Sequence, residues 1–171
     1  MPTPIPLTAT VDIAAPPDRV WALVGDPTRM PRWSPELRAL RRLGRGPVRV
    51  GSTLLGINRR GLVVWPTTST VTRLEPGRAV AWRTRESGAT WTYQLEPAGT
   101  GTRLTARRDL PAFTGLTATL GPLIGGAAGH DRELDAGLRT TLGRIKAAAE
   151  AAADPSTGAS TGAATDGSGA R

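Results

Sequence analysis

The sequence has no cysteine, one histidine and, among its 22 basic residues, one lysine. The missing cysteines exclude disulfide frameworks, zinc–thiolate sites, iron–sulfur clusters and thiol nucleophiles. A single histidine excludes a histidine-rich metal cluster. No serine of the expected domain lies in a Gly-x-Ser-x-Gly motif, and no glycine loop followed by lysine resembles a phosphate-binding loop. We therefore expect no metal and no cofactor.

Signals for export and for spanning a membrane are also missing. The first six residues carry neither a basic start nor a continuous apolar run, so we expect no signal peptide and a cytoplasmic location. Residues 110–129 are uncharged and as long as a membrane span, but they include five glycines and two prolines. We expect this segment to face a cavity or a lipid, which allows transient membrane contact without a transmembrane segment.

The net charge of +8 raises the question of nucleic-acid binding. The arginines are scattered along the chain, and only residues 38–49 hold a dense group, which we interpret as a solvated loop. Because sequence-independent phosphate binding needs a contiguous basic face, we expect no nucleic-acid partner.

The chain divides into one domain with two short flanks. Its 171 residues suffice for one domain with a sizeable core. The last eighteen residues are mostly Gly, Ala, Ser and Thr, which bury too little surface to offset the entropy of ordering. We expect a flexible leader over residues 1–6, a domain over 7–153 and a disordered tail over 154–171.

Residue patterns predict one strand, two short helices, six further strands and one long helix. The prolines before Asp18 start the first short helix, and Asp26 followed by Pro27 starts the second, which reaches Trp33. Glycine-rich turns then recur at the spacing of an antiparallel meander, and Trp65 before Pro66 suggests a bulge. The expected strands are 7–13, 37–43, 52–58, 62–74, 79–85, 90–96 and 102–110.

The last element is a helix with one apolar face. Apolar residues recur at steps of three or four from Leu116 to Ile145, which is a helical period. Glycine and proline over residues 121–126 break its early part, so we expect the firm helix over 130–152. Its apolar stripe needs a matching surface, and the curved sheet is the only one available.

Five segments carry a family resemblance: residues 11–21, 26–35, 71–76 and 95–104, and the closing helix over 138–150. In this order they resemble the START/polyketide cyclase–dehydrase superfamily, also called SRPBCC. The resemblance implies an α+β helix-grip fold, in which a curved seven-stranded antiparallel sheet wraps around a long C-terminal helix. It does not specify a function, because the superfamily includes lipid carriers, polyketide aromatases and cyclases, and ligand sensors.

The candidate ligand site is the apolar inner surface between sheet and helix. Alternation along the strands and the helical stripe predict which side chains line it. They are Trp82, Trp91, Tyr93, Leu104, His130, Leu134 and Leu138.

Two of these residues are candidates for catalysis. His130 is either a cavity-facing general acid or base, or a histidine hydrogen-bonded near the helix start. Tyr93 either donates a hydrogen bond to a ligand carbonyl, or belongs to the core with its hydroxyl near an edge. The sequence leaves both alternatives open.

Four arginines lie on late strands: Arg83, Arg85, Arg107 and Arg108. We interpret them as a solvated ladder on the outer face, the alternative being that one points inward toward an acidic ligand group.

The sequence therefore supports binding of an apolar small molecule, such as a lipid, a polyketide or an isoprenoid, in an internal cavity. The alternative is a polyketide cyclase or dehydratase that uses the same cavity through positioning and a few hydrogen-bond donors. A cofactor-free regulatory module is a third interpretation. Whether the protein is an enzyme is left open by the sequence.

Overall fold

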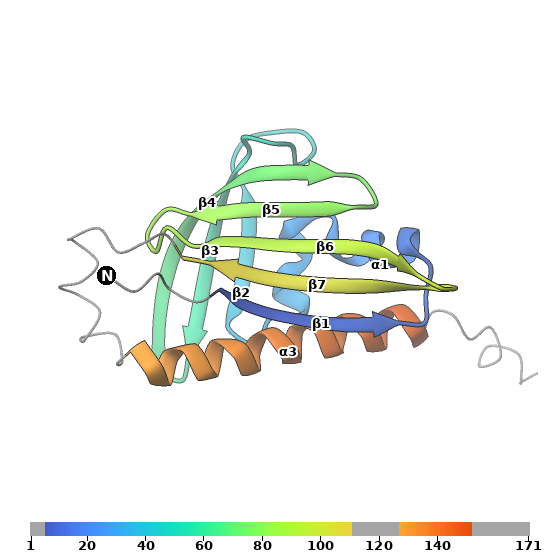
Figure 1. Ribbon diagram of the computed structural model, residues 1–171. Helices are drawn as coiled ribbons and strands as arrows, with labels where there is room; N and C mark the ends of the chain where they lie inside the picture. The colour runs from blue at the N-terminus through green and yellow to red at the C-terminus, as the bar shows by residue number, and fades with distance from the viewer. Residues whose placement is uncertain (1–5, 111–126, 152–171) are drawn as a thin grey trace, which may run out of the picture.

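The computed structural model describes residues 6–110 and 127–151, with the side chains of the second segment described from residue 133 (Figure 1). The expected tail, and the leader apart from Pro6, lie outside the described residues. The elements are β1 (Leu7–Ile13), α1 (Pro17–Val24), the 3-10 helix η1 (Pro27–Arg32), β2 (Leu37–Arg42), β3 (Thr53–Arg60), β4 (Val63–Glu75), β5 (Ala79–Thr84), β6 (Thr90–Ala98), β7 (Gly101–Asp109) and α3 (Ala127–Ala151).

The seven strands form one antiparallel sheet in the order β1-β7-β6-β5-β4-β3-β2. The sheet curves, and α3 lies across its concave side (Figure 1). The predicted α+β helix-grip fold is confirmed. The first strand has the predicted bounds, and the other elements differ from the prediction by three residues or fewer at each end.

Proline, glycine and a capping aspartate lie at the ends of the two short helices. Pro17 occupies the first turn of α1, and Gly25 follows its last residue. A Cβ atom at Gly25 would lie 2.4 Å from the Trp21 ring, so glycine lets that ring pack over the end of the helix. At the start of η1 the Asp26 carboxylate accepts a hydrogen bond of 2.9 Å from the backbone N–H of Thr28.

The bulge predicted at Trp65 is wrong. Trp65 and Pro66 pair in continuous register with β3, opposite Asn58 and Ile57. Pro66 is tolerated there because β5 pairs with β4 only from Ser69 onward, which leaves that edge of β4 open at the proline. The register of β4 shifts further along, between Val71 and Arg73.

Helix α3 buries one stripe of side chains against the sheet. The stripe consists of Leu134, Leu138, Leu142, Ile145 and Ala149. These side chains follow the helical period that the sequence predicted.

Polar contacts hold both ends of α3. Near its start, Arg60 on β3 forms an ion pair of 2.8 Å with Glu133. Near its end, the Lys146 ammonium donates to the backbone carbonyl of Asp12 and to Glu150, and the Glu150 carboxylate also accepts from the backbone N–H of Ala14. The helix is therefore fixed along its length relative to β1 and β3. None of the described helices is long and apolar enough to cross a membrane.

Candidate functional site

The inner face of the sheet has an apolar core and a more polar edge. Leu104, Leu95 and Ile145 belong to one hydrophobic core cluster, which also includes Trp82 and Tyr93. Trp91 packs against this cluster, and beyond it the same face carries buried polar side chains such as Arg108. The candidate site is this aromatic and polar edge of the core, on β4 to β7.

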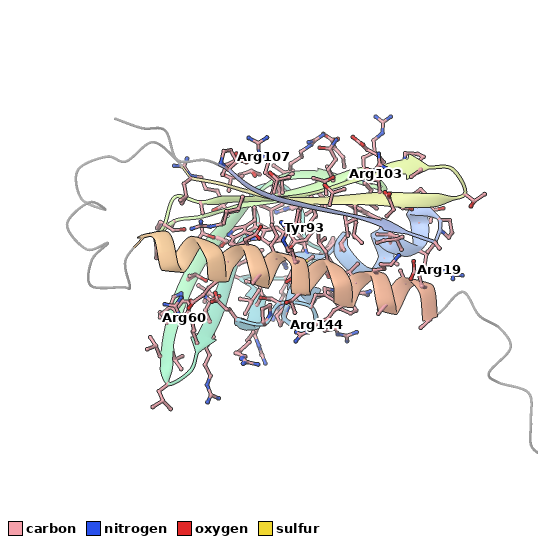
Figure 2. All side chains as sticks on the ribbon, turned by 60° about the horizontal axis from the view of Figure 1, so that its bottom comes forward. Arg19, Arg60, Tyr93, Arg103, Arg107 and Arg144 are labelled. Atoms are coloured by element: carbon pink, nitrogen blue, oxygen red, sulfur yellow. The ribbon has the colours of Figure 1, made fainter. Side chains whose placement is uncertain are left out.

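Two aromatic residues form the floor of the candidate site. The rings of Trp82 and Tyr93 are stacked with centroids 5.6 Å apart and an interplanar angle of 14°. Trp91 lies directly opposite Trp82 on the neighbouring strand and is only partly buried. Tyr93 lies between helix and sheet, whereas Arg103 and Arg107 lie on the outer side (Figure 2). The predicted inward orientation of these three aromatic residues is therefore observed.

The Tyr93 hydroxyl is the most distinctive polar group on this face. Its side chain is buried, and its hydroxyl is not among the fully enclosed polar atoms of the described residues that lack a hydrogen-bond partner. Burial raises the pKa of this phenol well above its ordinary value, because the ionised form would lose its hydration. Tyr93 therefore stays neutral at physiological pH, and a neutral phenol is able to donate a hydrogen bond.

Arg108 faces inward, which is the alternative that the sequence left open for one of the four arginines on the late strands. Its side chain is 8% exposed, and its guanidinium carbon lies 5.6 Å from the centroid of the Trp91 ring. This is the geometry of a cation–π contact. The outer-ladder interpretation holds for Arg83, Arg85 and Arg107, which are exposed, and is wrong for Arg108. The signal was present, because the alternation of Leu104 and Ala106 extends to Arg108 and not to Arg107.

Two hydrogen-bonded pairs of polar side chains extend the lining of the candidate site toward β3. One joins two hydroxyls, and the other joins an amide to a hydroxyl. The hydroxyls of Ser69 and Thr84 lie 3.1 Å apart across β4 and β5, and both side chains are buried. Further along, the Asn58 amide donates to the Thr67 hydroxyl at 3.1 Å. Hydroxyl and amide oxygens have two lone pairs each, so these pairs keep the capacity to bind a further polar group.

The helix side of the site is described only in part. His130 lies in the first turn of α3, and its side chain is outside the described residues. Leu134, one turn further on, is buried at the boundary of the site. Leu138 is packed into the core cluster beside Leu104. Ligand contact by these residues, and catalysis by His130, stay predictions.

The outer face carries a shallow groove of about 260 Å³, lined by Thr70, Thr72, Arg83 and Arg85. It lies on the opposite side of the sheet from Tyr93 and Arg108, so it is separate from the candidate site. Among the described residues no group of three or more His, Asp or Glu side chains is arranged to hold a metal ion.

The family described as polyketide cyclase/dehydrase and lipid transport matches residues 4–150. The chain belongs to this family. No curated protein sequence matches the chain.

Solved structures of the same fold include two aromatase/cyclases. The di-domain aromatase/cyclase StfQ of the steffimycin pathway aligns with a TM-score of 0.70 at 18% identity, over 87% of this chain and 51% of StfQ, so this chain spans about half of that protein. The aromatase/cyclase Zhui from Streptomyces sp. R1128 aligns with a TM-score of 0.67 at 20% identity, over 91% of this chain and 99% of Zhui. At these identities the likeness shows a shared fold.

A third structure is more similar in sequence. The polyketide-cyclase-like protein Cgl2372 from Corynebacterium glutamicum aligns with a TM-score of 0.61 at 27% identity, over 94% of this chain and all of Cgl2372. The alignment over the whole of Cgl2372 agrees with the helix-grip fold found for this chain.

Proposed function

We propose that this chain binds an apolar small molecule with at least one oxygen acceptor, such as a polyketide, a lipid or an isoprenoid, between the N-terminal half of α3 and the inner face of β4 to β7. One observation carries the proposal. Tyr93, stacked on Trp82, places a hydrogen-bond donor among aromatic side chains on the inner face of the sheet. A ligand oxygen that accepts from this hydroxyl gains a hydrogen bond in addition to apolar contact with the rings.

The surrounding residues support a ligand of this class. Trp82 and Trp91 provide flat apolar surfaces, which suit aromatic rings and unsaturated chains. Arg108 supplies a permanent positive charge and several N–H donors beside Trp91. An apolar body with one or two oxygens therefore finds both kinds of contact on this face.

Binding is favoured over catalysis by what these groups are able to do. Tyr93 is held neutral and Arg108 stays charged, so neither takes up a proton at neutral pH. Both donate hydrogen bonds. Donors of this kind orient a ligand carbonyl without any proton transfer.

The alternative is cyclisation of a poly-β-ketone in the same place. The same two donors would stabilise a developing enolate, and His130 is the candidate base. The names of StfQ and Zhui, both aromatase/cyclases, support this alternative. A cytoplasmic location stays a prediction, and so does the transient membrane contact expected from the sequence.

The proposal is tested with two fluorescent probes of similar apolar character. Cis-parinaric acid carries a carboxylate, and 1,6-diphenylhexatriene carries no oxygen. We expect both to bind, and Tyr93→Phe to weaken only the acid, by about fivefold to tenfold, because one hydrogen bond is lost. Arg107→Ala on the outer face is the matched control and should change neither affinity. Failure of both probes to bind would contradict the proposal.

A further inference from the structure

The turn between β3 and β4 exposes three consecutive apolar side chains to solvent. Leu62, Val63 and Val64 are 96%, 64% and 58% exposed. We refer to these three residues as the hairpin tip. Single exposed apolar residues are common, but a contiguous group on a projecting turn is typical of an interaction site.

The hairpin tip is held in a defined position. Gly61 has a positive φ of 58°, which allows the tight turn that places Leu62 at its end. Arg60, directly before the turn, forms the ion pair with Glu133 on α3. The hairpin therefore crosses the start of the helix, and its turn extends beyond the helix (Figure 2).

The apolar surface of the tip continues along the outer face of the hairpin. Leu55 and Ile57 are 44% and 43% exposed there, and Val64 is on the same face. Arg59 lies opposite Val64 beside the tip, whereas Arg41, opposite Leu55, lies toward the far end of the hairpin.

The charge around the hairpin is mainly positive. Among the described residues, the acidic ones that contact the hairpin include Glu133, which pairs with Arg60, and Glu86, whose carboxylate accepts from the Thr68 N–H on β4. Glu36 accepts from the Arg59 N–H through its backbone carbonyl. The whole chain has a net charge of +8. An apolar tip bordered by arginines is complementary to a lipid bilayer that carries anionic headgroups.

We propose that the hairpin tip inserts into the surface of an anionic lipid bilayer. A bilayer accepts a small convex apolar group, whereas a stable protein interface buries roughly 800 Å² on each partner, far more than three side chains provide. The arginines beside the tip then contact lipid phosphates. A second copy of the chain is the competing occupant, and the experiment below distinguishes it.

The proposal extends the function proposed above by naming the surface that meets the membrane. The tip lies beside the start of α3, and Arg108 lies opposite Leu7 at the start of β1, so insertion brings the Arg108 side of the candidate site toward the membrane. Membrane binding is measured without any added ligand, so the two proposals fail separately.

A single-cysteine label tests the insertion directly, because the chain has no other cysteine. Leu62→Cys is labelled with a polarity-sensitive nitrobenzoxadiazole dye, and Leu43→Cys, half exposed between β2 and β3 at the far end of the hairpin, is the matched control. With vesicles of phosphatidylcholine and phosphatidylglycerol we expect a blue shift at position 62 and none at position 43. No shift at position 62, or equal shifts at both positions, overturns the proposal.

Vesicle flotation with unlabelled variants supplies the second readout. Leu62→Ser combined with Val64→Ser should lower the vesicle-bound fraction by about tenfold, and Leu43→Ser should leave it unchanged. Both sets of residues are exposed, so the variants should fold. Vesicle binding should weaken when the vesicles contain phosphatidylcholine alone and when salt is added.

Light scattering tests the competing occupant. If it shows a dimer that the double variant dissociates while vesicle binding persists, a second copy covers the tip and the proposal is wrong.

Discussion

Arg107 and Arg108 are consecutive in β7 and lie on opposite faces of the sheet. Arg107 forms an exposed ion pair of 2.6 Å with Asp109, whereas Arg108 is buried over the Trp91 ring. The period of two along a strand accounts for this difference. The pair offers a matched comparison, because the same substitution at adjacent positions tests the inner and the outer face.

We expect Arg108→Leu to weaken binding of cis-parinaric acid by about tenfold or more, because a charge-assisted contact to the carboxylate is lost. Arg107→Leu should leave the affinity unchanged, since its exposed ion pair contributes little. Arg108→Lys keeps the charge but loses the planar stacking, so its affinity should fall between those of Arg108→Leu and the unchanged protein. Titration by fluorescence checks this, with thermal melting as the control for folding. Equal effects at the two positions would remove Arg108 from the site.

The cyclase alternative makes its own prediction about His130 and Tyr93. If the protein cyclises a poly-β-ketone, His130→Ala and Tyr93→Phe should each change the distribution of cyclised products, which liquid chromatography and mass spectrometry separate. Our preferred function, binding, predicts that the unchanged protein leaves the distribution as it is in buffer. A change that depends on His130 would establish catalysis.

The core provides a prediction about stability. Ile145 is fully buried in the cluster that α3 forms with the sheet. Ile145→Ala should lower the free energy of unfolding by about 2–4 kcal/mol, through lost burial and the cavity left behind. Leu62→Ala, at the exposed hairpin tip, should change it by less than about 0.5 kcal/mol. Urea denaturation measures both, and similar losses at the two positions would contradict the described packing.

The contact between α3 and the end of β1 depends on pH. The hydrogen bonds from Lys146 and from the Ala14 N–H lower the pKa of the Glu150 carboxyl from its ordinary value of 4.5. Because the folded pKa is the lower one, this contribution to stability is complete above about pH 4.5 and is lost as the pH falls through the folded value. Glu150→Gln should therefore be less stable than the unchanged protein at pH 7, and the difference should shrink below roughly pH 4. A difference that stays constant down to pH 3 would show that Glu150 does not act through its charge.

Much of the fold was predictable because its signals are local. Neighbouring residues alone specify several elements: α1 by the prolines before Asp18, β6 by the alternation around Tyr93, and α3 by the helical stripe through Leu142. The candidate site was predictable only where alternation is strict, as for Trp82, Trp91 and Tyr93.

The polar half of the site depends on register, which the sequence does not show. Ser69 and Thr84 meet because β4 and β5 pair in one particular register, interrupted between Val71 and Arg73. An extra residue in one strand changes which side chains face inward. No residue type in this part of the sequence predicts that register shift. An inward Arg108 was left as the alternative for another reason, since four neighbouring arginines were interpreted as one outer ladder although alternation separates them.

Native mass spectrometry tests the central claim most directly. The purified protein is measured as isolated and after incubation with cis-parinaric acid. Our account predicts a one-to-one complex in both cases, whose small molecule is released on denaturation and extracts into organic solvent, and which Tyr93→Phe weakens. The bare protein mass in both measurements would contradict ligand binding between α3 and the sheet.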